Sequence, residues 1–149
     1  MNARAWLARL AILALLCGAV ARPAAAFVMD GPLIQSLRQV MAGDFEAYNK
    51  KDINALMAGI DSRSPDYEST KKAAEEQFKT LDGVKTELVD FVPMGHDDEF
   101  AVARIKAKTT GKPGSGFTDN TVDAIVLFHQ ENGEWKLWSE DVLGITVAP

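Results

Sequence analysis

The apolar residues of this chain change their spacing at Gly83, and this change constrains the fold more than any other feature. Before Gly83 they recur every three or four residues, which predicts amphipathic helices. After Gly83 they alternate with polar residues and become rich in β-branched and aromatic types, which predicts strands. Helices that precede all the strands are typical of an α+β fold with an antiparallel sheet.

Three helices are expected before Gly83. The first covers residues 32–50, with Pro32 in its first turn. The second follows Asp52, whose carboxylate is a suitable cap, and the third begins at Ser64. The first helix carries one apolar stripe, which consists of Leu33, Leu37, Val40, Met41, Phe45 and Tyr48. The inward face of the third helix is predicted to hold Tyr67, Ala74, Phe78 and Leu81.

Four strands are expected after Gly83, over residues 84–92, 100–109, 120–130 and 134–147. Asn132-Gly133 predicts a two-residue type I′ turn between the last two strands. If Glu131 and Glu134 face each other beside this turn, Trp135, Leu137, Ser139 and Asp141 share one face of the sheet with Val122, Ala124, Val126 and Phe128. A one-residue bulge would exchange the two faces on one strand.

Both faces of this hairpin are apolar in the middle, so something should cover each of them. The helices can cover the first face. A second copy of the chain is expected on the other face, which gives a homodimer with Trp138 as its anchor. The predicted dimer interface consists of Ile125, Leu127, His129 and Trp138.

Residues 1–26 have the pattern of a signal peptide. Arg4 and Arg9 precede an uncharged apolar run over residues 10–20, and Ala24-Ala25-Ala26 supplies an acceptable cleavage site. We therefore expect an exported protein, periplasmic or secreted, whose single domain covers residues 27–149 and has no membrane contact after cleavage. Lipidation at Cys17 is the alternative.

Charge and composition exclude several classes of function. Without Arg4, Arg9 and Arg22, 13 basic residues remain against 21 acidic ones, a net charge of -8. Nucleic-acid binders usually present a basic surface, so nucleic acid is not an expected partner. Only His96 and His129 could join acidic residues around a transition metal, and the sequence carries no phosphate-binding or dinucleotide motif, so no metal and no cofactor are predicted.

Several segments resemble the nuclear transport factor 2-like superfamily, which includes SnoaL-like and cystatin-like α+β cones. The segment at residues 47–52 resembles the junction of the family's first two helices, and Gly133-Glu134-Trp135-Lys136-Leu137-Trp138 resembles the final hairpin of small exported bacterial members. The resemblance covers about residues 31–147. It implies three helices packed in the concavity of a strongly bent four-stranded sheet, an internal pocket, and frequent dimers through the convex face.

The pocket that this resemblance implies would be lined by Phe45, Tyr48, Tyr67, Phe78, Phe128, Trp135 and Ser139. Our leading interpretation is a non-enzymatic domain that binds a small apolar or amphipathic ligand or presents a protein-binding surface. The alternative is an isomerase, cyclase or hydratase in which Asp141 acts with Tyr48 or Tyr67. Members similar to ketosteroid isomerase place an aspartate base on a strand after the second helix, and this chain has no evident segment for that strand, which counts against an enzyme.

Overall fold

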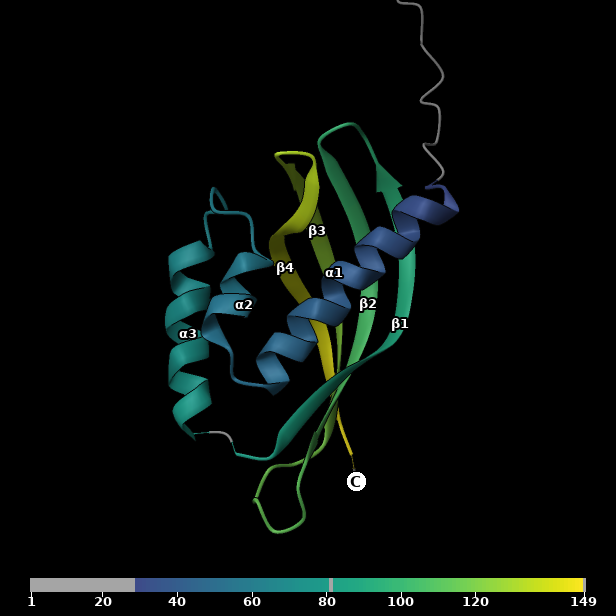
Figure 1. The fold of residues 1–149 in the computed structure, drawn as a ribbon. Coiled ribbons are helices and arrows are strands. Elements are labelled where there is room, and N and C mark those ends of the chain that lie inside the picture. The colour runs from purple at the N-terminus through teal and green to yellow at the C-terminus, as the bar shows by residue number, and fades with distance from the viewer. Residues whose placement is uncertain (1–28, 81, 149) are drawn as a thin grey trace, which may run out of the picture.

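The computed structural model of the protein describes residues 29–80 and 82–148. Three helices, α1 (Gly31–Asn49), α2 (Ile53–Ala58) and α3 (Tyr67–Thr80), precede four strands, β1 (Val84–His96), β2 (Phe100–Gly111), β3 (Asn120–Glu131) and β4 (Glu134–Val147). The helices lie on one side of the bent sheet, as the change of spacing at Gly83 predicts (Figure 1). The α+β fold is therefore confirmed. The predicted signal peptide, Cys17, the cleavage site before Phe27, and the side chain of Leu81 lie outside the described residues.

The helix starts follow from local hydrogen bonding. Asp30 accepts the backbone N–H of Leu33 at 2.8 Å and begins α1, and Asp52 begins α2 as predicted by accepting the N–H of Ala55 at 3.0 Å. The prediction for the third helix is wrong by three residues. The helix begins at Tyr67, and Ser64 accepts the N–H of Asp66 at 3.1 Å in the turn before it, while the Ser64 hydroxyl donates to the carbonyl of Trp138 at 2.6 Å and ties this segment to β4.

All strand pairs are antiparallel, in the order β1-β2-β3-β4. The first strand is longer than predicted and runs to His96 instead of ending at residue 92. Register shifts after Leu88 and after Pro93 allow the strand to continue through the proline, because a bulge releases the ladder position that a proline cannot fill. His96, expected in a turn, is the last residue of β1.

The hairpin turn between β3 and β4 is confirmed. Asn132 and Gly133 have φ values of 54° and 85°, as a type I′ turn requires, and Glu131 pairs with Glu134. Four residues later the predicted register is wrong. Phe128 pairs with Leu137, but Leu127 pairs with Ser139, so Trp138 is the extra residue of a bulge.

This bulge exchanges the two faces as far as Val142, and a second register shift, at Leu143, then restores them. Glu140 pairs with Val126 and therefore shares the face that the helices cover, whereas Asp141 pairs with Ile125 on the outer face. Ser139, opposite Leu127, also belongs to the outer face. The predicted placement of Ser139 and Asp141 on the helix-covered face is thus corrected, and Glu140 takes the inner position.

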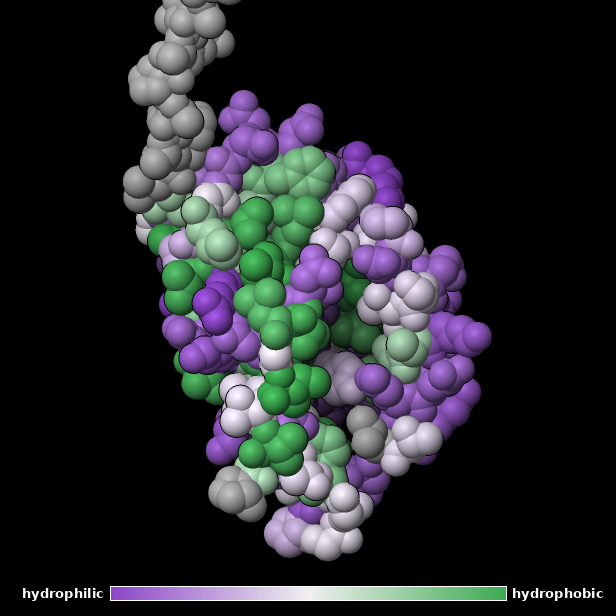
Figure 2. Space-filling view, turned by 180° about the vertical axis from the view of Figure 1, so that it is seen from behind, coloured by the Kyte–Doolittle hydropathy of each residue, from purple (hydrophilic) through white to green (hydrophobic). Residues whose placement is uncertain are grey.

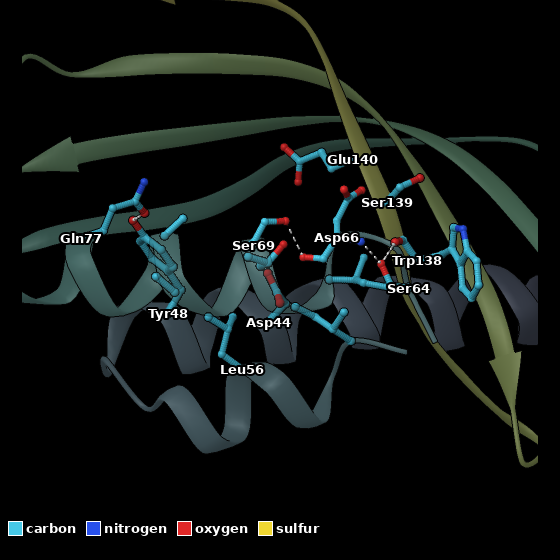
Figure 3. A pocket seen from close by; sticks show the side chains of 15 residues that line it. Asp44, Tyr48, Leu56, Ser64, Asp66, Ser69, Gln77, Trp138, Ser139 and Glu140 are labelled. Carbon is cyan, nitrogen blue, oxygen red and sulfur yellow. Dashed lines mark hydrogen bonds between the residues drawn. The ribbon is translucent and has the colours of Figure 1, made fainter. Parts of the chain in front are cut away.

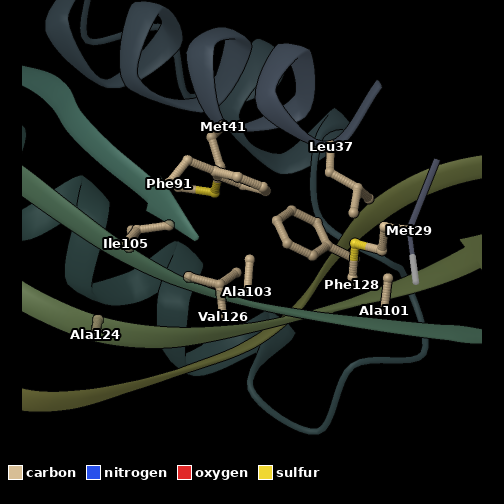
Figure 4. Close-up of a cluster of buried hydrophobic side chains, with 10 residues drawn as sticks. All are labelled: Met29, Leu37, Met41, Phe91, Ala101, Ala103, Ile105, Ala124, Val126 and Phe128. Carbon is tan, nitrogen blue, oxygen red and sulfur yellow. The ribbon is translucent and has the colours of Figure 1, made fainter. Parts of the chain in front are cut away.

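The main core lies between α1 and the inner face of the sheet (Figure 4). Leu37 and Met41 point from α1 toward Phe91, Val126 and Phe128, and Leu37, Met41, Val126 and Phe128 have no exposed surface. Small residues of β2 and β3 lie beneath them, namely Ala101, Ala103 and Ala124. These alanines let α1 approach the sheet closely, and Trp135 and Leu137 of β4 pack against the edge of the core.

The far end of β4 is not covered by the helices. Val142, Ile145 and Val147 are 54%, 62% and 57% exposed. Val142 and Ile145 pair with Ala124 and Val122, so they belong to the inner face, beyond the part that α1 covers. Seen from behind, a band of hydrophobic side chains runs down the molecule beside a hollow in the surface (Figure 2).

Candidate functional site

A cavity of about 480 Å³ lies between the three helices and β4. This volume is within the range of small-molecule sites in proteins. The apolar part of its wall consists of Leu56, Ile60, Ala73, Ala74, Leu137 and Trp138. The polar part consists of Asp44, Tyr48, Ser64, Asp66, Ser69, Thr70, Gln77, Ser139 and Glu140. The cone is therefore only partly filled by its own side chains.

Three carboxylates, those of Asp44, Asp66 and Glu140, lie in the middle of the cavity, between Tyr48 with Gln77 at one end and Trp138 at the other (Figure 3). Asp44 projects from α1, Asp66 from the segment before α3, and Glu140 from β4. None of the residues that line the cavity is a lysine, arginine or histidine. The site consequently presents negative charge and hydrogen-bond acceptors.

Among these three carboxyl groups, Asp44 has the most strongly shifted pKa. Burial, followed by repulsion from Glu140, raises the pKa of Asp44 from 3.8 to about 7. The side chain of Glu140 is partly open to solvent, yet desolvation by the surrounding protein also raises its pKa. Near neutral pH the pair therefore resists carrying two negative charges, and one carboxyl group can hold a proton.

Tyr48 closes one end of the cavity. Its hydroxyl donates to Oε1 of Gln77 at 2.6 Å, and its ring packs edge-on against Phe78 with 5.3 Å between the ring centroids. Burial raises the pKa of the Tyr48 hydroxyl. Because the hydroxyl proton is engaged with Gln77, Tyr48 offers the cavity only its oxygen lone pairs as acceptors.

A smaller hollow of about 340 Å³ lies on the other side of Asp44, between α1, α2 and the start of β4. Glu134, Trp135 and Lys136 border it. The ammonium group of Lys136 lies 2.7 Å from Glu131 and is engaged in that ion pair. The carboxylate of Asp44 thus makes no hydrogen bond or ion pair within the described part of the chain.

A second group of charged residues lies on the outer face of the sheet. Asp61 is fully buried; it accepts hydrogen bonds from the backbone and the guanidinium of Arg63 and lies 2.6 Å from Nδ1 of His129. An ionised carboxylate can only accept, so Nδ1 of His129 carries the proton. The imidazole packs between Phe100 and Trp138, with 4.5 and 4.9 Å between ring centroids.

The pKa of Asp61 is shifted in the opposite direction to that of Asp44. Burial alone would raise the pKa of Asp61, but the hydrogen bonds from Arg63 and then from His129 outweigh burial and lower the pKa from 3.8 to about 2. Asp61 is therefore ionised and fully partnered, which suits a structural role.

The segment after α2 contains no strand, as the sequence predicts, and it forms a single β-bridge instead. Only Ile60 pairs with β4, through hydrogen bonds from the N–H of Asp61 to the carbonyl of Leu137 and from the N–H of Leu137 to Gly59. This single bridge lies next to the Trp138 bulge. It directs Asp61 to His129 on the outer face instead of into the cavity.

The structure distributes the seven predicted pocket residues over several places. Tyr48 and Ser139 line the cavity, although the side chain of Ser139 points away from Asp44 (Figure 3). Phe45, Phe128 and Trp135 belong to the main core, and Phe78 packs in a second cluster with Ala47, Leu56 and Ala74. Tyr67 is not among the residues that line the cavity, and Asp141 faces outward, so neither converges with Tyr48.

The four predicted interface residues lie together on the outer face. Ile125 and Leu127 are half-buried in the single chain. His129 is held by Asp61, and Trp138 packs against its imidazole and, edge-on, against Phe100. The dimer interface stays a prediction.

Asp44 and Glu140 were not predicted as site residues. Asp44 could have been found, because Leu37, Met41, Asp44 and Tyr48 are spaced by four, three and four residues and place an acid on an otherwise apolar stripe. Glu140 could not, since its inward orientation depends on the bulge at Trp138.

The structure describes residues 29–80 and 82–148, and two absences hold for these ranges. Within these ranges no helix is long and apolar enough to cross a membrane. In the same part of the chain no group of three histidine, cysteine, aspartate or glutamate side chains is arranged to hold a metal ion.

Residues 39–147 match the family described as the C-terminal domain of the anti-sigma-I factor RsgI9. No curated protein matches the chain in sequence. Among solved structures, a Nostoc punctiforme protein of unknown function with a cystatin-like fold has a TM-score of 0.66 at 12% identity, over 81% of this chain and 95% of that one.

Two other solved structures have the same fold. An NTF2-like protein of unknown function from Pseudomonas putida has a TM-score of 0.65 at 14% identity, over 77% of this chain and 88% of that one. A scytalone dehydratase-like protein from Novosphingobium aromaticivorans has a TM-score of 0.57 at 12% identity, over 77% and 87%. These similarities confirm the nuclear transport factor 2-like fold, which hosts both enzymes and proteins of other function.

Proposed function

Because the chain belongs to the family of the RsgI9 C-terminal domain, whose description names a regulatory protein and no reaction, we propose that it is an exported, non-enzymatic domain that binds a small amphipathic molecule. The ligand occupies the cavity between the helices and β4. Ligand binding in the cavity would then act as a signal to a protein or segment connected to this domain.

This proposal rests on the open cavity, whose wall is apolar on one side and polar on the other. One side is apolar, with Leu56, Ile60 and Leu137, and the other presents the carboxylate of Asp44, which has no partner among the described residues. Asp44 is half-buried, and the desolvation of its carboxylate is unfavourable, so a ligand that supplies a partner binds favourably. Apolar walls with a few converging polar groups are typical of ligand sites.

We expect the variant Ala73→Trp to abolish ligand binding. Ala73 lines the cavity from α3 but is exposed, so an indole there fills the cavity without disturbing the core. Three ten-carbon probes, decylammonium, decanol and decanoate, differ in head-group charge at pH 8 and can be titrated calorimetrically below their solubility and micelle limits. At least one should bind the native protein, with affinity reduced more than tenfold in Ala73→Trp.

The matched control is Ala42→Trp, which places the same indole on an exposed position of α1 that lines neither hollow. It should bind the probes like the native protein. If no probe binds the native protein, or if both tryptophan variants bind equally well, the cavity is not a ligand site.

A second function is favoured by one observation. A carboxyl group with a pKa of about 7 is suited to exchange a proton with a substrate near neutral pH, so Asp44 could act as the acid–base group of an isomerase or hydratase. This replaces Asp141, which faces away from the cavity. The two functions differ in one outcome: a bound ligand is recovered chemically unchanged from a binding domain and is converted by an enzyme.

A further inference from the structure

We propose that the ligand of this cavity is an amphipathic cation, whose ammonium group lies between Asp44 and Glu140 and whose hydrocarbon chain follows the uncovered inner face of β4. This inference rests on the proposed function and adds the chemical class of the ligand. Its site is the cavity and the apolar strip that continues it, and the carboxylates determine only which head group is preferred.

The charges around the cavity favour a cation. Asp44, Asp66 and Glu140 line it, and no basic side chain does. Lys136, which borders the neighbouring hollow, is occupied by Glu131. A neutral head group would leave the repulsion between Asp44 and Glu140 in place, and an anion would add to it. A single positive charge between the two carboxylates removes the repulsion and supplies hydrogen-bond donors to both.

The apolar part of the ligand can contact the cavity wall and the uncovered end of β4 beyond Glu140. Leu56, Ile60 and Leu137 line the inner end. Two residues beyond Glu140, Val142 lies on the same face of β4, followed by Ile145, and both are more than half exposed. Exposed apolar strips that adjoin a cavity are typical of binding grooves.

The affinity for a cation should depend on pH. The titratable groups that line the two hollows with Asp44 are Glu140, Asp66 and Tyr48 in the cavity and Glu134 and Lys136 in the smaller hollow, and of these Glu140 shifts the pKa of Asp44. Because burial and Glu140 raise the pKa of Asp44 to about 7, Asp44 becomes protonated below neutral pH and loses its attraction for an ammonium group. An alkylammonium ion keeps its own charge up to about pH 10, as lysine does.

The test uses the three ten-carbon probes at pH 8, and decylammonium and decanol also at pH 5, where decanoate would be partly protonated. We expect decylammonium to bind at least tenfold more tightly than decanol at pH 8, and decanoate to bind most weakly. Between pH 8 and pH 5 the affinity for decylammonium should fall by roughly 100-fold, about tenfold per pH unit below 7, while that for decanol should change little.

Matched variants locate the charge. Asp44→Asn and Glu140→Gln should each lower the affinity for decylammonium at least tenfold, whereas Asp141→Asn, adjacent in sequence but on the outer face, should leave it unchanged. Decanol or decanoate could bind as tightly as decylammonium and lose that binding in Ala73→Trp. This result would overturn the assignment of a cation but leave the ligand-binding function in place. If no probe binds, the ligand-binding function and the assignment of a cation both fail.

Discussion

The variant Asp44→Asn is expected to stabilise the fold by up to about 4 kcal/mol at pH 8. The pKa of Asp44 is raised from 3.8 in the unfolded chain to about 7 in the fold. The folded state therefore binds the proton more tightly, and stability is lost as the pH rises from 4 to 7. An asparagine carries no charge at any pH and avoids this loss.

The pH dependence distinguishes this effect from a general change in packing. At pH 4 the carboxyl group of Asp44 is protonated in the folded protein, so Asp44→Asn should change the free energy of unfolding by less than about 1 kcal/mol there. Urea denaturation at both pH values gives the comparison. Asp141→Asn, an exposed carboxylate of the outer face, should lie within about 0.5 kcal/mol of the native protein at both. Equal stabilities of Asp44→Asn and the native protein at pH 8 would show that Asp44 is not desolvated.

Asp44 lowers the stability of the fold at neutral pH, which favours a functional role for its carboxylate. Stability is commonly lower where a site must present an unpaired charge to a ligand, and substitutions that relieve such strain lose function. Asp44→Asn should therefore be more stable and bind the cationic probe less well, a combination that a purely structural carboxylate would not produce.

The variant Asp61→Ala should have the opposite effect and lower stability by about 3–5 kcal/mol at pH 7. Asp61 is fully buried, and its removal leaves the imidazole of His129 and the guanidinium of Arg63 without their acceptor. It also loosens the segment that bridges α2 to β4 at Leu137. The control is Asp123→Ala, which breaks the more exposed pair with Arg104 at 2.7 Å and should cost less than about 1 kcal/mol.

The two aspartates also differ in their response to acid. The pKa of Asp61 is lowered to about 2, so its contribution of roughly 2 kcal/mol is present above pH 4 and is lost as the pH falls through 2. In urea denaturation the native protein should therefore lose stability below pH 4 more steeply than Asp61→Ala. Similar costs for Asp61→Ala and Asp123→Ala would contradict the account of the Asp61 network.

Much of the fold could be predicted from the sequence because its determinants are local. The change of apolar period at Gly83 depends on side-chain spacing, the cap at Asp52 on one carboxylate, and the turn at Asn132-Gly133 on two residues that tolerate positive φ. Each of these acts within a few residues, so distant contacts do not change the outcome.

The site could be predicted only in part because it depends on contacts between distant segments. The bulge at Trp138 forms where β4 pairs both with β3 and with the single residue Ile60, and no local pattern indicates it. One extra residue was enough to turn Asp141 outward and Glu140 inward. The position of Asp61 follows from the same bridge, which the sequence around Gly59 does not indicate.

The central claim concerns the pKa of the Asp44 carboxyl group in the cavity. Burial and Glu140 raise this pKa, and a bound cation lowers it. Carbon-detected NMR of the side-chain carboxyl of Asp44, recorded as a pH titration with and without decylammonium, tests this claim most directly. We expect a midpoint near the pKa of about 7 in the free protein and a lower midpoint with the cation bound. A midpoint near 4 that decylammonium does not move would contradict the account.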